Sequence, residues 1–352
     1  MPTQPGAAQR VTIRDIAQRA GVSKGAVSYA LNGRPGLSED TRARILRIAD
    51  ELGWYPHRAA RSLSAARANA CGLVLARPAT TLAVEPFFME LIAGVESVLA
   101  LRSVALTIQV VADPQQEVAV HRRWWGERRV DGVLVVDLRI DDPRIGELAR
   151  LGLPAVVLGG PPEGNILPAV WNDEVVVVEE VVHYLAALGH ARIGWVAGVD
   201  TFAHTRVRTE AFRRITRQLS IWSKVVANDY TAESGARATR RLLSDPEPPT
   251  AVVYDSSILA VTGLGVAHQM GFTVPDDVSI VAWDDSLICQ VVHPPLTAVM
   301  RDITAYGVAA SERLLGAIDG SVTGDVEVPP GVLTPRGSTA PPSRGAVKRA
   351  RR

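Results

Sequence analysis

The 352-residue sequence has few of the residues that mark a secreted, metal-binding or membrane protein. Its two cysteines, Cys71 and Cys289, are too few for a disulfide framework, and no Cys/His cluster has the spacing of a zinc site. No apolar run approaches the roughly 20 residues of a membrane helix, and the N-terminus lacks the apolar segment of a signal peptide. We therefore expect a soluble, cytoplasmic protein with no membrane partner, metal or cofactor.

Net charge is also almost absent, because 38 Lys and Arg face 37 Asp and Glu and leave a formal charge of +1. The charges are nevertheless segregated along the chain. Residues 1–70 carry a net charge of +6 and residues 336–352 another +6, so the middle of the chain, 71–335, carries −11. A basic head and tail flank an acidic body, and the near-zero average does not exclude a nucleic-acid partner. With 47% hydrophobic residues, the chain is long enough to form two or three domains.

The basic head, residues 11–55, shows signals for three short helices after a disordered segment, 1–10. Thr12 and Asp15 form a capping box that opens the first helix. Gly21 ends it, and Ser23 can cap a second helix that runs to about residue 31. Ser38 can cap the third. Apolar residues recur at helical spacing in each, with Ile13, Ile16, Ala17 and Ala20 expected inward in the first.

Two helices joined by a tight glycine turn are typical of a helix-turn-helix, whose second helix presents its first residues to DNA in the major groove. In this geometry Lys24, Gly25 and Tyr29 face the bases. Ser23, Ser28 and Asn32 can form hydrogen bonds with phosphates or bases. The alternative is a generic three-helix bundle with a solvated basic face. The candidate DNA-binding residues of the head are Thr12, Ser23, Lys24, Gly25, Ser28, Tyr29 and Asn32.

The sequence of the head resembles the DNA-binding head of the LacI/GalR family. The resemblance is carried by VTIRDIAQRAGVSKGAVSYALNG, followed by LSEDTRARILRIADELGWYPHRAARSLS. The resemblance implies a hinge within residues 56–70 that becomes helical on operator DNA. Arg58 and Arg61 would then contact DNA, and Leu63 would wedge open a base step in the minor groove. The alternative is a plain linker. Ala26 and Tyr29 stand where the family usually has Thr and Arg, so the operator sequence cannot be transferred from a relative.

From Cys71 onward, short β-rich apolar runs alternate with helical stretches, which is typical of βα units and parallel sheets. The longest interval between runs falls midway and predicts two doubly wound lobes with a ligand cleft between them. This resembles the periplasmic-binding-protein-like core of the same family, here over residues 71–335. The predicted strands are 72–76, 104–110, 132–136, 155–158, 193–197, 224–227, 251–254 and 279–283.

The body carries no nucleotide-binding or nucleophile-elbow motif, so we do not expect an enzyme. His190, at a helix-to-strand junction, is expected to be structural. A ligand of sugar size needs aromatic faces and side chains that bind hydroxyls in pairs. By match to the family's motifs, the candidate ligand-binding residues are Phe87, Phe88, Asp173, Arg208, Tyr230, Ser256 and Asp284.

Alternative roles remain open for several of these residues. Phe87 and Phe88 can belong to the core, and Asp173 can simply cap a helix. Ser256 and the residue after it stand where relatives usually carry Asn-Asp, and Asp255 is a possible substitute. The effector is expected to be a carbohydrate of a kind that the sequence does not identify.

Residues 336–352 are rich in Gly, Pro, Ser, Ala and Arg, and predict a disordered basic tail. No leucine heptad of the kind that forms the tetramerising helix of some relatives is present. A homodimer is expected because a twofold head binds two half-sites, with residues 87–101 as one plausible face of its interface. Together these features predict a ligand-responsive repressor that binds a pseudo-palindromic DNA operator. The alternatives are a small-molecule receptor with a non-regulating head, and a sugar-modifying enzyme fused to a DNA-binding head.

Overall fold

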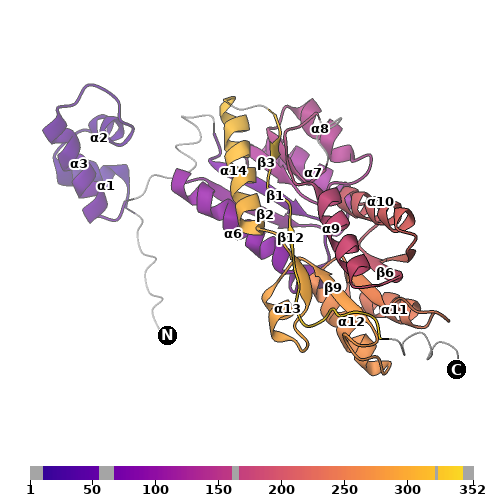
Figure 1. Cartoon of the computed structure of the whole chain (residues 1–352). Coiled ribbons are helices and arrows are strands. Elements are labelled where there is room, and N and C mark those ends of the chain that lie inside the picture. The colour runs from indigo at the N-terminus through magenta and orange to yellow at the C-terminus, as the bar shows by residue number, and fades with distance from the viewer. Residues whose placement is uncertain (1–10, 55–66, 161–165, 322–323, 344–352) are drawn as a thin grey trace, which may run out of the picture. The chain divides into compact units, whose positions relative to one another are not determined.

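The computed structural model describes residues 11–54, 67–160, 166–321 and 324–343, and it divides after Arg67 into two compact units (Figure 1). The predicted N-terminal segment 1–10, the hinge residues Arg58, Arg61 and Leu63, and the end of the tail, 344–352, lie outside the described residues.

The head consists of three helices, as the capping signals predict: α1 (Ile13–Ala20), α2 (Lys24–Leu31) and α3 (Glu39–Glu51). The Asp15 carboxylate accepts hydrogen bonds from the backbone N–H and the hydroxyl of Thr12, both at 2.7 Å. Gly21 ends α1 in the left-handed conformation with φ of 66°, which glycine adopts without strain. Ser23 accepts a hydrogen bond from the N–H of Ala26 and thereby caps α2.

The core of the head is small and is contributed by all three helices. Ile16, Val27 and Ile45 are completely buried in it. Ile13 was expected to face inward, and this is wrong: it lies in the first turn of α1 and is 36% exposed, because the packed stripe of α1 begins one turn later, at Ile16 and Ala17. The three-helix core fixes how α2 presents its outer face.

The first lobe of the body is a six-stranded parallel sheet with the order β11-β5-β4-β3-β1-β2. Apolar side chains of α6 and α14 pack on one face of this sheet, and those of α7 and α8 on the other. The strands are β1 (Ala70–Leu75), β2 (Ala105–Val110), β3 (Gly132–Val135), β4 (Ala155–Leu158), β5 (Ala169–Trp171) and β11 (Val326–Glu327). The helices are α5 (Ala79–Leu82), α6 (Pro86–Leu99), the 3-10 turn η1 (Ala100–Arg102), α7 (Pro114–Gly126), α8 (Pro143–Leu151) and α14 (Ile303–Asp319).

The second lobe has the same design, with the strand order β12-β10-β9-β8-β6-β7, in which only β12 is antiparallel to its neighbour. Apolar side chains of α9 and α10 pack on one face, and those of α11 and α12 on the other. The strands are β6 (Arg192–Ala197), β7 (Trp222–Ala227), β8 (Ala251–Tyr254), β9 (Ser279–Trp283), β10 (Thr297–Met300) and β12 (Val332–Thr334). The helices are α9 (Glu174–Ala187), α10 (Ala203–Gln218), α11 (Ala232–Leu243), α12 (Ser257–Gln269) and α13 (Leu287–Val291).

All eight predicted strands are present, which confirms the two-lobed α/β body. The sequence did not predict that the chain crosses between the lobes three times. It leaves the first lobe after β5, returns after β10 to form α14 and β11, and ends in the second lobe with β12 (Figure 1). Close packing of α14 on α6 stabilises this second crossing. A Cβ on Gly94 would lie only 2.1 Å from the carbonyl oxygen of Thr304, so the two helices can approach this closely only with glycine at that position.

Two predicted boundaries differ from the structure. The body begins before residue 71, because the Asp131 carboxylate accepts hydrogen bonds from the backbone N–H groups of Ala68 and Ala70. The prediction of disorder from residue 336 onward is wrong for residues 336–343. Ser338 is fully buried, donates to the carbonyl of Ile280 and accepts from the N–H of Thr297. These hydrogen bonds hold residues 336–343 against the second lobe.

Candidate functional site

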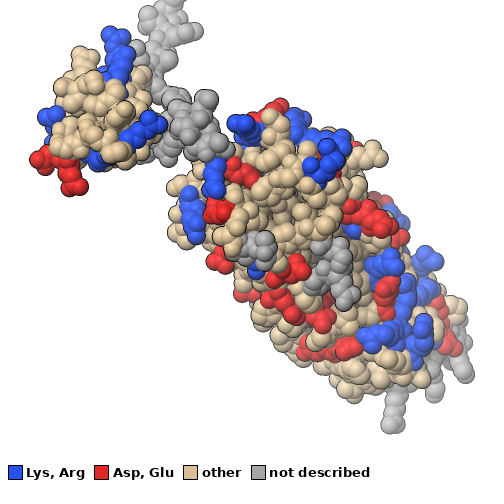
Figure 2. Space-filling view, turned by 90° about the horizontal axis from the view of Figure 1, so that it is seen from above, with Lys and Arg blue, Asp and Glu red and all other residues tan. Residues whose placement is uncertain are grey.

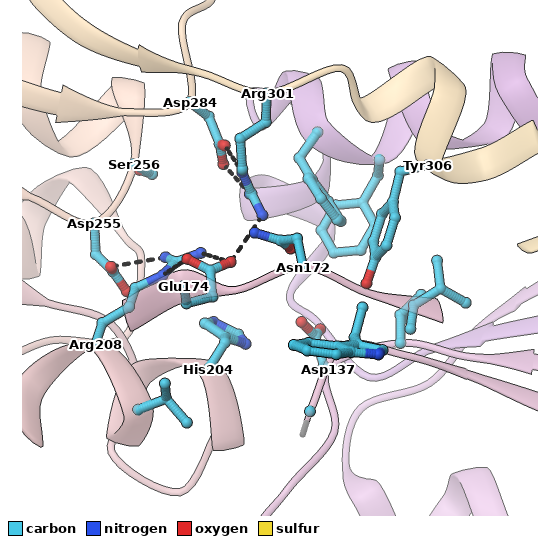
Figure 3. Close-up of a pocket in the computed structure, with 18 of the residues that line it drawn as sticks. Asp137, Asn172, Glu174, His204, Arg208, Asp255, Ser256, Asp284, Arg301 and Tyr306 are labelled. Atoms are coloured by element: carbon cyan, nitrogen blue, oxygen red, sulfur yellow. Dashed lines mark hydrogen bonds and ion pairs between the residues drawn. The ribbon is translucent and has the colours of Figure 1, made fainter. Parts of the chain in front are cut away.

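A cavity of about 180 Å³ lies between the two lobes of the body, at the carboxyl ends of the parallel strands. Arg77 and Asp137 reach it from the first lobe after β1 and β3, and Arg208 and Tyr230 from the second lobe after β6 and β7. Loops at this edge of doubly wound sheets are where such folds bind ligands. Figure 3 shows the polar side chains of the cavity converging on one space.

On the second-lobe side, two arginines and three carboxylates form one continuous ion-pair network (Figure 3). Arg208 donates two hydrogen bonds to Glu174, at 2.8 and 3.0 Å, and a third to Asp255 at 2.8 Å. Arg301 donates to both oxygens of Asp284, at 2.6 and 2.8 Å, and reaches Glu174 at 3.2 Å. Bidentate pairs of this kind fix the direction of each guanidinium group.

Burial and the neighbouring charges act in opposite directions on the pKa of Glu174. Burial alone would raise the pKa of Glu174, but the guanidinium groups of Arg208 and Arg301 outweigh it and lower that pKa to about 2. Burial and the nearby Arg208 lower the pKa of His204 to about 4. At neutral pH the Glu174 carboxylate is therefore ionised, and the nearby imidazole of His204 is neutral.

On the first-lobe side, Arg77 pairs with Asp137 through two hydrogen bonds, at 2.8 and 2.9 Å. Although burial would raise the pKa of Asp137, Arg77 lowers it to about 2. The guanidinium of Arg77 also lies 4.5 Å from the ring centre of Phe202 and 4.6 Å from that of Tyr230, both in the second lobe. These cation–π contacts connect the two lobes across the cavity.

All seven ligand-binding residues predicted from the sequence line this cavity: Phe87, Phe88, Asp173, Arg208, Tyr230, Ser256 and Asp284. Several already have a partner within the protein. Asp173 caps α9 through the N–H groups of Val175 and Val176, as the alternative interpretation held, and Ser256 caps α12. Phe88 is buried in the core of the first lobe.

Tyr230 and Asp284 have φ of 65° and 66°, the left-handed region that non-glycine residues seldom occupy. The Tyr230 hydroxyl donates to Asp255 at 2.8 Å and lies 3.1 Å from Nε2 of His204. Strained backbone of this kind tends to cluster at ligand sites.

The sequence interpretation missed several charged groups of the cavity. Arg77 and Asp137 follow β1 and β3 almost directly, and a charged residue at the end of a buried strand was the signal that could have identified them. Arg301 follows β10, a strand that was not predicted. Asp255 was considered only as a substitute for Ser256, whereas its carboxylate is buried and bound to Arg208.

His190 has the structural environment that was expected for it. It is buried, and its Nδ1 lies 2.8 Å from the hydroxyl of Thr250. Burial lowers the pKa of His190 to about 4. The residue precedes β6, at the amino end of that strand, and is not among those that line the cavity.

In the head, the first turn of α2 is open to solvent. Lys24 and Gly25 are exposed, and Tyr29 is 43% exposed one turn further along. Asn32 donates to the carbonyl of Ser28 at 2.9 Å and thereby closes the end of α2. Lys and Arg side chains lie at several points on the surface of the head (Figure 2).

Two features of other protein classes are missing from the described part of the chain. Within these ranges, no group of His, Cys, Asp and Glu side chains is arranged to hold a metal ion. The described helices do not include one with the length and apolarity that crossing a membrane requires. Cys71 and Cys289 are both buried and free.

Comparison with known proteins identifies both units. Residues 12–57 match the family model for bacterial regulatory proteins of the lacI family, and residues 182–339 match that for a periplasmic binding protein-like domain. The chain is 32% identical to the HTH-type transcriptional regulator AglR of Rhizobium meliloti, over 88% of each chain. It is 31% identical to the regulator CelR of Thermobifida fusca, over 91% of this chain and 95% of that protein.

Solved structures agree with this assignment. A LacI family regulator from Bifidobacterium animalis is 36% identical, covers 79% of this chain and all of its own, and has a TM-score of 0.73. A complex of CelR with cellobiose is 29% identical, covers 94% of this chain and all of its own, and has a TM-score of 0.69. The operator-bound Lac repressor dimer, 23% identical over 94% of this chain and all of its own, shares the fold with a TM-score of 0.84. The chain belongs to the lacI family of bacterial transcription regulators.

Proposed function

We propose that this regulator is a homodimeric repressor that binds a pseudo-palindromic operator and responds to a carbohydrate in the interlobe cavity. The observation that carries the proposal is that one chain contains both a DNA-binding motif and a ligand cavity. The motif is a helix-turn-helix in which the first turn of α2 is exposed, and the cavity is lined by polar groups of two lobes. The complex of the relative CelR with cellobiose supports a saccharide as the ligand class. Because its target is DNA, we place the protein in the cytoplasm.

On the DNA side, Lys24, Gly25 and Tyr29 contact base edges from α2 in the major groove. The hydroxyls of Thr12, Ser23 and Ser28 and the amide of Asn32 contact phosphates or bases nearby. In the hinge, Arg58 and Arg61 approach the minor groove, and Leu63 acts as the wedge. The exposure of the first turn of α2 supports the first of these assignments.

On the ligand side, the seven cavity residues named above bind the effector together with Asp255. Occupation of the cavity changes how the lobes close. The loop after β3 meets the loop after β6 through hydrogen bonds from Ile140 to Thr201 (3.0 Å) and from Ala203 to Leu138 (2.8 Å). These bonds and the Arg77 contacts are among the interlobe interactions that closure would adjust. The moving lobes then favour or disfavour the ordered hinge, which transmits the signal to the head.

The dimer forms through apolar side chains that each lobe exposes. Met89 and Leu101 in and after α6, and Ile108 on the edge strand β2, are exposed in the first lobe. Leu287 and Val291 of α13 are 74% and 70% exposed in the second lobe. Exposed apolar side chains that form one patch are typical of association surfaces. The α6 surface is the one that the sequence analysis proposed.

Operator selection from random DNA, followed by an electrophoretic mobility shift with the selected sequence, tests the proposal. The expected result is a site with two related half-sites that binds one dimer, and binding that Lys24→Ala weakens strongly. Ligand binding by the body without any sequence-specific DNA binding would refute the repressor and favour a receptor whose head does not regulate.

A further inference from the structure

Two buried polar side chains at the first-lobe end of the cavity have no hydrogen-bond partner among the residues that the structure describes. Thr81 is 3% exposed, and its hydroxyl makes no hydrogen bond with any of them. Glu85 is 8% exposed, and its carboxylate makes no hydrogen bond or ion pair with any residue of the described ranges. Both residues line the cavity. Buried polar groups are nearly always paired, so these two require an explanation.

The local backbone holds the pair in place. The N–H of Glu85 donates to the carbonyl of Thr81 at 3.1 Å, so Thr81, in α5, lies one turn before Glu85, the N-cap residue of α6. Glu85 occupies the N-cap position, but its side chain does not cap the helix. At α8 and α14, the N-cap residues Asp142 and Asp302 each accept a backbone N–H. The Glu85 carboxylate is thus left available to the cavity.

The charges around the cavity restrict what can bind Glu85. Three arginines line the cavity, and each is already bound to at least one carboxylate of the protein. Burial and the carboxylates of Asp284 and Asp137 raise the pKa of Glu85 to about 7, against the opposing effect of Arg77 and Arg301. A ligand with a further negative charge would add to the repulsion, and no unpaired guanidinium group lines the cavity within the described ranges to offset it.

We propose that Thr81 and Glu85 form a subsite for a hydroxyl or ammonium group of the effector, and that they select neutral or cationic polyhydroxylated ligands over phosphorylated or carboxylated ones. The inference rests on the proposed function of the cavity. It assigns the two unpaired groups to the ligand: the carboxylate accepts from a ligand O–H or N–H group, and the threonine hydroxyl donates or accepts beside it.

The test uses matched probes with the full chain. Isothermal titration calorimetry measures the affinity for each of three groups of compounds. The neutral group is glucose, galactose and cellobiose, and the amino group is glucosamine and galactosamine. The anionic group is glucuronate, galacturonate and the 6-phosphates of both hexoses. We expect binding among the neutral and amino compounds, at least about tenfold tighter than that of the anionic derivative of the same sugar, or about 1.4 kcal/mol. Binding by none of the panel, or tighter binding of an anionic derivative, would overturn the inference.

Variants separate a binding role from a structural one. In Glu85→Gln, the affinities for a neutral sugar and for its anionic derivative are expected to differ by only a few-fold. Glu90→Gln removes an exposed charge near the start of α6 that does not line the cavity, and should leave the wild-type ratio of the two affinities unchanged. Equal discrimination in wild type and Glu85→Gln would contradict the role of Glu85.

Thermal stability supplies a readout that does not depend on finding a ligand. A buried polar group without a partner destabilises the folded state, so Thr81→Val at neutral pH and Glu85→Gln at pH 8 should raise the Tm of the free protein. A clear fall in the Tm of both would show that the two groups are satisfied within the protein, and would refute the subsite. Failure of the subsite is distinguishable from failure of the repressor function, because operator binding is measured independently.

Discussion

Replacing Arg208 by Met tests whether the buried ion-pair network holds the second-lobe wall of the cavity. The substitution keeps an apolar stem that can pack against Trp283, whose ring centre lies 4.5 Å from the guanidinium carbon. It removes three hydrogen bonds, two to Glu174 and one to Asp255. Asp255 keeps its bonds from the Tyr230 hydroxyl and from the N–H of Gly198.

The magnitude follows from the pKa of Glu174. Its fall from the ordinary value of 4.5 to about 2 corresponds to about 3 kcal/mol of stability at neutral pH, at about 1.4 kcal/mol per pKa unit. Removing one partner of a buried ion pair typically costs about 3–5 kcal/mol. Because Arg301 still reaches Glu174, we expect the lower end of that range, about 3 kcal/mol.

The assay is urea denaturation of Arg208→Met and wild type at pH 7 and at about pH 3.5. A carboxylate with a lowered pKa stabilises fully above its ordinary pKa of 4.5, and loses that effect as the pH falls toward 2. The deficit of the variant should therefore shrink at the lower pH. Arg206→Met, which removes an exposed pair with Glu210, should cost less than about 1 kcal/mol. Equal losses in the two variants, or a deficit independent of pH, would refute the reasoning.

Three further predictions concern the DNA contacts and the return of the chain to the first lobe. Leu63→Ala is expected to weaken specific operator binding at least about tenfold and to leave non-specific binding nearly intact; equal losses on both DNAs in a mobility shift would rule out the wedge. Gly94→Ala forces a Cβ against the Thr304 carbonyl, and should destabilise the body by about 1–3 kcal/mol in urea denaturation, whereas Gly146→Ala, with open space around it, should not. Deleting residues 344–352, which include five Lys or Arg, should flatten the salt dependence of operator affinity; an unchanged slope would mean that the tail does not touch phosphates.

Local signals were sufficient to predict the head. The capping box at Thr12, the left-handed turn at Gly21 and the cap at Ser23 each depend on residues within three or four positions, and the structure has all three. The eight main strands were also predicted. Six of them are buried on both faces and read as continuous apolar runs, whereas β2 and β7 are partly exposed strands at the sheet edges. The strands β5, β11 and β12 were missed because two or three residues are too few for such a run. The four-residue strand β10 was missed as well.

The candidate site was predicted in outline only. Similarity to the family pointed to seven residues that do line the cavity, but it did not reveal which of them pair with one another. The ion pair between Arg301 and Glu174 joins residues 127 positions apart, and it depends on the crossings of the chain between the lobes. Thr81 and Glu85 likewise look like ordinary residues before a helix in the sequence. The structure shows that both are buried, that the Thr81 hydroxyl has no hydrogen bond to a described residue, and that Glu85 does not cap α6.

The most direct test of the account is the coupling between the cavity and the DNA-binding head. The affinity for the selected operator is measured by fluorescence anisotropy with and without a saturating saccharide from the panel, and the affinity for that saccharide is measured with and without operator. We predict that both affinities change by the same factor, in the range of about 5- to 150-fold. A saccharide that binds the cavity tightly and leaves operator affinity unchanged would contradict the account.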